Sequence, residues 1–357
     1  MRVFRFIFFC LLVGLSFLPS SAEEAKSETY PKFELGGQVQ FQLDQGSLGS
    51  GSSSSGHPVR NGIGRFPVDS QVSPRRLRLY PRLLLSEQVS IINETDFDPD
   101  EFEHDELVLT VLDLYLKYEF AQGHHLRAGQ FKVPFGYEFF RSSRTLTTIE
   151  RSDASRQLFQ RDIGLGVFGK EGPFEYGIGV FQGQGQNEHE RNGTNDVAAR
   201  LLYSVSPGLK MGLSGQLGTF RPQGHSPDFQ VRRAGVEVHY EDGPWLIDGE
   251  YLFSNGYNLF SRDATDSQGY YLYGTCRLQE PLDLVLGYDR FDPQRGAQGF
   301  GRDENALNDR DRYTLGLNYY LSREPIHRVM LNYEFRNELE GPGASTRGLR
   351  LRYQYSW

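Results

Sequence analysis

Hydrophobic and polar residues alternate along most of this chain with a period of two. In residues 33–43, the apolar residues Phe33, Leu35 and Phe41 share one parity, and glutamate, glycine and glutamine residues occupy the other. Residues 347–357 repeat the pattern. Because successive side chains of a strand point to opposite faces, this alternation predicts β-strands with one apolar and one polar face.

Sixteen segments of this kind can be recognised, separated by breaks rich in glycine, proline and small polar residues. They span residues 33–43, 75–85, 88–98, 107–119, 124–132, 162–170, 174–182, 195–205, 208–219, 230–241, 245–254, 268–279, 282–291, 310–321, 327–337 and 347–357. Each is about ten residues long, which is enough for a tilted strand to cross a bilayer.

The breaks between the segments are alternately short and long. Short breaks such as Ser206-Pro207 and Glu280-Pro281 contain the residues that tight turns favour. The long breaks are residues 44–74, 99–106, 133–161, 183–194, 220–229, 255–267, 292–309 and 338–346. All long breaks then lie on one side, as in outer-membrane barrels with short periplasmic turns and long extracellular loops.

The last segment has the features of a strand that faces lipid on one side and water on the other. Its apolar face consists of Leu349, Leu351, Tyr353, Tyr355 and Trp357. A soluble β-sandwich also alternates, but it would not impose the short–long order of the breaks. The sequence therefore predicts an all-β fold, a transmembrane antiparallel β-barrel of about 16 strands over residues 33–357.

Residues 1–22 have the pattern of a cleaved signal peptide. Two arginines precede an apolar run that ends at Leu18, and small residues follow it. The run is too short to span a bilayer. We expect residues 23–32 to form a short periplasmic segment before the barrel.

Composition agrees with a barrel and excludes several other classes. Aromatic residues reach 13%, and there are 40 glycines, yet no segment after the signal peptide is apolar for the roughly 18 residues that a transmembrane helix needs. Only Cys276 would remain after cleavage, so we expect no internal disulfide. The formal charge of −8 argues against a nucleic-acid-binding protein, because such proteins carry an excess of basic residues.

Arginine is the notable residue on the polar face of two segments. Arg76, Arg78 and Arg82 share one parity in the second segment, and Arg350 and Arg352 share one in the last. A closed barrel places these five residues on one sector of the wall, where forked, permanent charges could form a path for anions. In the alternative interpretation they are neutralised by inward acids on neighbouring strands, namely Glu34, Asp44, Glu94 and Asp96.

The long break at residues 133–161 is a second candidate site. In sixteen-stranded porins the third outer loop folds into the lumen and sets the constriction, and this break is the third by count. The cations of the loop and its two ends are Lys132, Arg141, Arg144, Arg151, Arg156 and Arg161, against the acids Glu138, Glu150 and Asp153. A locally cationic constriction is the arrangement that an anion filter needs.

Several segments resemble a known family, the phosphate-selective porins O and P. The similar segments are Gly129–Glu138 (GQFKVPFGYE) with Ser142-Ser143 and Glu150-Arg151, Arg75–Leu79 with Asn93–Phe97, and Asp162–Leu165. The specific resemblance covers about residues 75–170. It implies a trimeric outer-membrane channel, some of whose relatives bind phosphate or polyphosphate at a cationic constriction.

These observations lead to one functional prediction. We expect a bacterial outer-membrane porin, embedded in lipid, through which small hydrophilic solutes diffuse passively, with a preference for anions and with phosphate or polyphosphate as candidate solutes. The predicted anion pathway consists of Arg76, Arg78, Arg82, Lys132, Arg141, Arg144, Arg151, Arg156, Arg350 and Arg352.

Other functions remain as alternatives: a non-selective porin, a sugar channel lined by Tyr80, Tyr271 and Tyr273, or a surface adhesin. We find no catalytic constellation, cofactor motif or metal-binding pattern. The His124-His125 pair and the acidic stretch 96–103 are more typical of solvated turns and loops, so we do not expect an enzyme.

Overall fold

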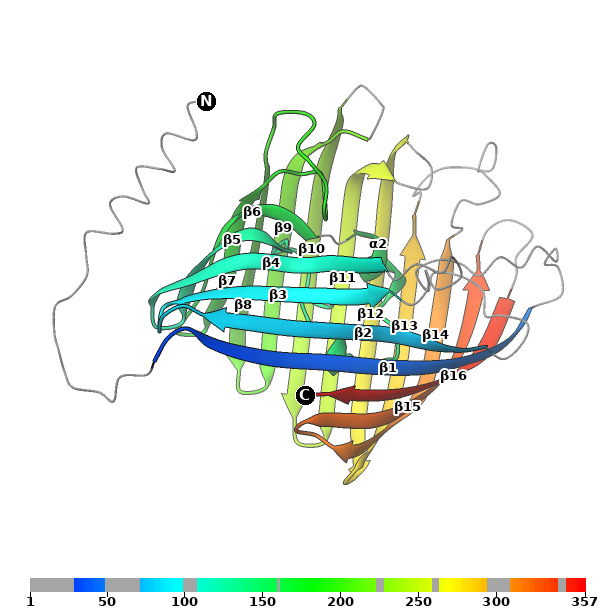
Figure 1. Ribbon diagram of the computed structural model, residues 1–357. Helices are drawn as coiled ribbons and strands as arrows, with labels where there is room; N and C mark the ends of the chain where they lie inside the picture. Colours follow the sequence, from blue (N-terminus) through cyan, green and yellow to red (C-terminus); the bar gives the residue numbers. More distant parts are fainter. Residues whose placement is uncertain are drawn as a thin grey trace.

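The computed structural model describes residues 29–48, 71–98, 108–158, 161–222, 228–258, 263–293, 309–339 and 345–357. Within them, sixteen strands form a closed barrel in which neighbours along the chain pair in antiparallel fashion and the last strand pairs with the first (Figure 1). The predicted fold is confirmed. The predicted signal peptide, residues 1–22, lies outside the described residues.

The strands follow the order of the chain around the barrel. They are β1 (Lys32–Leu48), β2 (Gln71–Leu84), β3 (Val89–Asp98), β4 (Val108–Ala121), β5 (His124–Lys132), β6 (Arg161–Glu171), β7 (Phe174–Phe181), β8 (Asp196–Ser206), β9 (Leu209–Phe220), β10 (Phe229–Asp242), β11 (Trp245–Asn258), β12 (Asp263–Gln279), β13 (Leu282–Asp292), β14 (Arg310–Ser322), β15 (Ile326–Glu338) and β16 (Ser345–Ser356).

Four strands extend several residues further toward the long loops than the sequence pattern predicts; one is β2, which begins at Gln71 instead of residue 75. β1 continues to Leu48 instead of residue 43, while β11 continues to Asn258 and β12 begins at Asp263. The β11–β12 ladder remains paired there, for example Asn255 with Asp266. These extensions lack a regular alternation of apolar and polar residues, so backbone pairing continues where the hydrophobic pattern no longer indicates it.

The two faces of the wall have opposite polarity. Outward residues are apolar and exposed on the isolated barrel, as for Phe33 at 66% and Leu213 at 62% of their surface. Their inward neighbours include Gln38 and Gln40, which are fully buried. This inversion relative to a soluble protein is what a barrel with a lipid-facing exterior and a polar interior requires.

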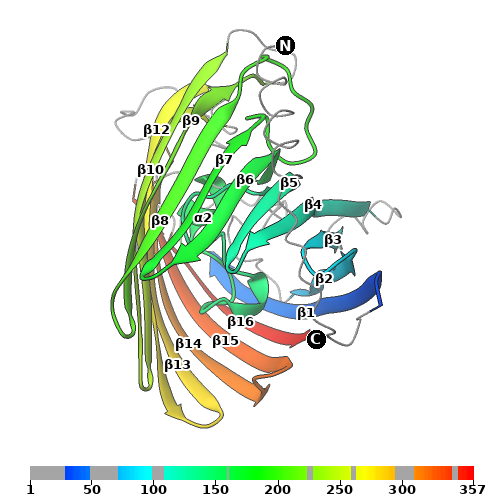
Figure 2. The same ribbon diagram turned by 90° about the vertical axis from the view of Figure 1, so that its left-hand side faces the viewer.

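One connection lies within the barrel. The segment between β5 and β6 contains a short 3₁₀ helix, η3 (Ser143–Thr145), and the helix α2 (Asp153–Leu158). The turned view in Figure 2 shows α2 inside the ring of strands. None of the helices in the described residues has the length and apolar character to cross a membrane.

Candidate pore and inner loop

The inner loop, residues 133–158, crosses the lumen and is fixed to the opposite wall. The Gly136 amide donates to Ser214 Oγ on β9 at 3.0 Å, and the Tyr137 amide donates to Glu250 Oε1 on β11 at 2.7 Å. Further along, Asn318 on β14 donates to the Thr147 carbonyl at 3.0 Å. These contacts bring together strands that are far apart in the barrel, so the loop occupies the interior.

Apolar residues hold the inner loop against part of the wall. Its residues Val133, Phe135, Ala154 and Leu158 are buried in one cluster with inward-facing wall residues. The wall residues of this cluster are Phe131, Phe168, Phe181, Ala198, Leu252 and Phe291. The lumen is therefore not uniformly polar: it contains a local hydrophobic core, which stabilises the loop by excluding water from it.

Inward glycines on β6 and β7 make room for this cluster. A Cβ at Gly177 would lie 2.7 Å from the Phe168 ring and 3.2 Å from Pro134 at the start of the loop. A Cβ at Gly166 would also approach the Phe168 ring, at 2.9 Å. The rings can lie close to the backbone because these positions carry no side chain.

One carboxylate forms ion pairs with three arginines where the inner loop meets β2 and β16. Glu150 accepts from Arg75 at 2.8 Å and Arg76 at 3.1 Å and is also paired with Arg352, which donates to the Ile149 carbonyl. Burial would raise the pKa of Glu150, but the three guanidinium charges outweigh it and hold the pKa well below its usual value. Two predicted pathway residues, Arg76 and Arg352, therefore anchor the loop.

The other predicted wall arginines form ion pairs with neighbouring strands. Arg78 pairs with Glu94 at 2.9 Å and with Asp96 at 2.7 Å. Arg82 lies 3.4 Å from Glu34, and Arg350 lies 3.1 Å from Asp44. The five wall arginines lie on β2 and β16, which flank β1, so they occupy one sector of the wall. These ion pairs are the ones expected in the alternative interpretation, in which acids on neighbouring strands neutralise the wall arginines.

Several cations around the inner loop bind backbone carbonyls instead of carboxylates. Lys132 Nζ donates to the Phe139 carbonyl at 2.9 Å, and Arg151 Nε donates to the Glu138 carbonyl at 3.0 Å. Burial lowers the pKa of Arg151 to about 10, which leaves it charged at neutral pH. A carbonyl satisfies the donor without cancelling the charge, so Arg151 contributes positive potential to the interior.

The remaining predicted loop cations have different environments. Arg141 pairs with Asp248 on β11. Arg156 lies in α2, where burial lowers its pKa to about 10. The Arg144 guanidinium lies 4.7 Å from the centre of the Tyr80 ring, and its Nε donates to Ser142 Oγ at 3.3 Å. Within the described part of the chain, Arg144 has no carboxylate partner.

Sequence reasoning did not single out the far-wall residues that hold the inner loop. Arg328 on β15 donates to the Leu146 carbonyl at 3.1 Å and to the Arg144 carbonyl at 3.0 Å. Arg312 on β14 donates to the Arg151 carbonyl at 2.9 Å. Both arginines share the polar parity of their strands, so alternation indicates that they face inward. It gives no indication that their partners are loop carbonyls.

Other candidate features lie outside the pore pathway. Tyr271 and Tyr273 stack on each other with ring centres 4.7 Å apart and are buried, so they do not offer an open aromatic surface. No group of three or more His, Cys, Asp or Glu residues suited to a metal ion occurs in the described ranges. Most of the acidic stretch 96–103 lies outside them.

Comparison with solved structures places this architecture among bacterial outer-membrane porins. The channel DcaP of Acinetobacter baumannii is 14% identical with a TM-score of 0.66, over 93% of this chain and 99% of that one. An anion-selective porin from Comamonas acidovorans is 12% identical with a TM-score of 0.62, over 92% and 100%. The trimer form of Vibrio cholerae OmpT is 14% identical with a TM-score of 0.57, over 92% and 100%. At these identities the likeness shows the fold.

The closed sixteen-stranded barrel with a polar interior is a porin of the bacterial outer membrane, a channel for small solutes. Residues 69–225 match the family phosphate-selective porin O and P, which confirms the resemblance recognised in residues 75–170. Comparison with curated proteins gives no significant match.

Proposed function

We propose that this porin is a passive diffusion channel that prefers anions, with its constriction formed by the inner loop. One observation carries the proposal: Arg151 and Arg328 donate to backbone carbonyls of the inner loop and form no ion pair with a carboxylate in the described part of the chain. Fixed positive charge in a narrow aqueous passage raises the local concentration of anions and opposes cations.

The predicted pathway residues have unequal parts in this proposal. Arg144 and Arg151 lie on the inner loop and have no carboxylate ion pair in the described ranges, so they supply positive charge, while Lys132 beside the loop donates to its carbonyls. The paired residues hold the wall and the loop in place and contribute less to the field. These paired residues are Arg76, Arg78, Arg82, Arg141, Arg350 and Arg352.

Phosphate or polyphosphate is the solute class that the family match supports, because the matching family is described as phosphate-selective. The anion-selective porin among the structural neighbours supports the broader class. A homotrimer is supported by the trimeric form of the OmpT neighbour. Both assignments are part of the proposal.

A non-selective porin is the second candidate, and the ion pairs of the arginine sector favour it. Arg78 has two carboxylates within 3 Å, and such pairs cancel much of the field that a solute experiences. In that case selectivity would be weak, and phosphate would not compete with chloride.

Planar-bilayer recording of the purified protein separates these candidates. Under a KCl gradient, we expect stepwise conductance and a reversal potential on the anion side. Inorganic phosphate added to the same bilayer should reduce the chloride current in a saturable way. A reversal potential on the cation side would reject the anion preference, while an anion preference without phosphate block would reject phosphate as the solute.

A further inference from the structure

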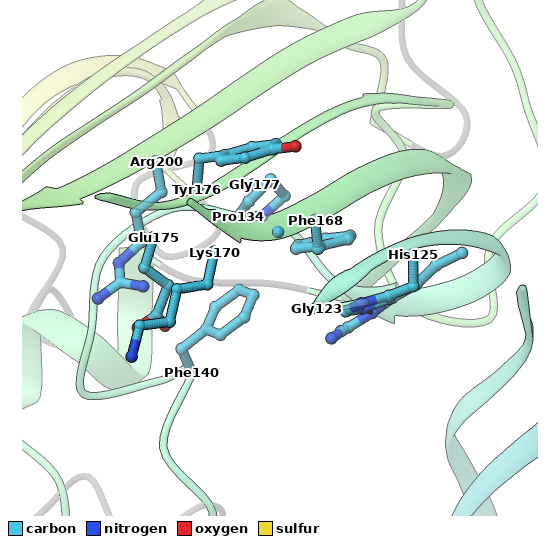
Figure 3. A pocket seen from close by; sticks show the side chains of 12 residues that line it. Gly123, His125, Pro134, Phe140, Phe168, Lys170, Glu175, Tyr176, Gly177 and Arg200 are labelled. Carbon is cyan, nitrogen blue, oxygen red and sulfur yellow. Dashed lines mark hydrogen bonds between the residues drawn. The ribbon is translucent and has the colours of Figure 1, made fainter. Parts of the chain in front are cut away.

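A cavity of about 240 Å³ lies beside the inner loop, at the end of the barrel that carries the short turns. Its lining comes from β5 to β8 and from the loop, and includes Phe140, Phe168, Lys170 and Arg200 (Figure 3). Arg127 lines it as well. The turn residue Gly123 is part of the lining, so a solute could enter the cavity from the periplasmic mouth. The anion pathway described above does not include it.

One side of the cavity is aromatic. The rings of Phe140 and Phe168 lie 6.3 Å apart at an angle of 39°, and His125 stacks on Phe168 with ring centres 5.5 Å apart. The Arg127 guanidinium lies 4.1 Å from the centre of the Phe168 ring. Flat side chains at these spacings form a surface on which another flat group can stack.

The charged part of the lining is incompletely compensated. Arg127 Nε donates to His125 Nε2 at 3.1 Å, and because that acceptor is a neutral imidazole nitrogen, the Arg127 charge is retained. The Lys170 ammonium has no side-chain partner within the described ranges. Arg200 is paired with Glu237 at 2.7 Å. Glu175 lies opposite Lys170 in the strand register, but no ion pair joins them.

We propose that this cavity is a binding subsite for small organic carboxylates with a flat, unsaturated body. The rings of Phe140 and Phe168 would contact the body, and Lys170 and Arg127 would bind the carboxylate. Inorganic phosphate would bind the cations but would make no contact with the aromatic rings, so the lining favours an organic anion. This subsite rests on the proposed anion passage, because its ligand must enter the same lumen.

Benzoate and acetate are matched probes, since they share a carboxylate and differ by a ring. In planar bilayers at constant chloride, benzoate should reduce the single-channel current in a saturable way, with acetate at equal concentration having little effect. Lys170→Gln should raise the half-blocking benzoate concentration about three- to tenfold, the range expected for one charge-assisted contact. Glu175→Gln should lower it, because the only acid of the lining is removed.

Lys210→Gln is the matched control. Lys210 is an inward lysine at the start of β9, near the same end of the barrel, but it does not line the cavity. Its substitution should leave the benzoate block unchanged. Heat-modifiable migration on a gel checks that each variant folds.

The outcomes separate the subsite from the anion preference. Equal effects of benzoate and acetate, or equal effects of Lys170→Gln and Lys210→Gln, would overturn the subsite even if the reversal potential favours anions. A cation-side reversal potential with a benzoate block that depends on Lys170 would reject the anion preference and keep the subsite.

Discussion

At the scale of single residues, Arg144 is the loop cation best placed to act on a passing anion. Its neighbours are the Tyr80 ring and a serine hydroxyl, neither of which cancels its charge. We expect Arg144→Glu to lower the anion-to-cation permeability ratio about two- to fivefold, because a fixed positive charge becomes negative in the passage. Reversal potentials measured under a KCl gradient give this ratio directly.

Arg82→Glu is the comparison for that experiment. Arg82 makes its ion pair with Glu34 at the exposed edge of the wall, where solvent screens both charges. The permeability ratio of this variant should stay near that of the native channel. Equal changes in the two variants would show that the charge of the whole lumen matters and that Arg144 has no special position.

A second prediction at the scale of single residues concerns the stability that Glu150 confers. Glu150→Gln removes the carboxylate that the buried Arg76 and Arg352 and the partly exposed Arg75 share, and breaking a buried ion pair typically costs about 3 kcal/mol. Urea unfolding in detergent or lipid should report a loss of this size. Glu171→Gln, at an exposed turn, should change the free energy of unfolding very little.

The stability conferred by Glu150 should also depend on pH in one direction. Its folded-state pKa is held well below the usual value by the arginines, so its contribution is complete above the unfolded pKa of about 4.3. It is lost only as the pH falls toward the folded-state pKa. The stability difference between native protein and Glu150→Gln should therefore be constant from pH 7 to about 5 and decrease below 4. A decrease already between pH 7 and 6 would contradict this assignment.

At the scale of secondary-structure elements, the inward glycine positions of β6 and β7 must stay free of side chains. Gly177→Ala would place a Cβ 2.7 Å from the Phe168 ring, and overpacking of this kind costs about 1–3 kcal/mol. Gly215→Ala on β9 is the control, because its nearest neighbour would be 3.6 Å away. The urea concentration at the midpoint of unfolding should fall for Gly177→Ala and not for Gly215→Ala. Equal midpoints would show that the Phe168 ring moves aside freely.

The strands were predictable from the sequence, while the course of the inner loop was not. A strand between lipid and water must alternate, so β5 matches the expected residues 124–132 at both ends. The apolar residues that hold the loop break this rule, since Leu252 shares the inward parity of Asp248 and Glu250. A pattern along one strand cannot reveal that an inward leucine packs against a loop from elsewhere in the chain.

For the molecule as a whole, closure of the ring explains which parts of the candidate site could be foreseen. Antiparallel neighbours and a β1–β16 seam place the arginines of β2 and β16 on one sector without further information. Their partners depend on side-chain length and on the register between strands, such as Arg78 opposite Asp96. The backbone carbonyls that accept hydrogen bonds from Arg328 and Arg312 belong to the inner loop. Because the strand pattern does not indicate the course of that loop, these contacts could not be predicted.

The seam itself provides the last prediction. Gly37 and Trp357 exchange two backbone hydrogen bonds of 3.1 Å each, and the indole lies over Gly37, where a Cβ would overlap the ring. Gly37→Val should displace the indole and weaken the seam by about 1–3 kcal/mol. The temperature at which the folded band converts to the unfolded band on a gel should fall.

Two further variants decide whether the indole is the cause of that loss. Gly274→Val, at an outward glycine whose nearest neighbour would be 3.7 Å away, should convert at the native temperature. In a Trp357→Ala background, Gly37→Val should cost much less, because the ring it would strike has been removed. If Gly37→Val lowers the conversion temperature equally with and without the indole, then the backbone of β1 and not the packing of Trp357 limits closure of the barrel.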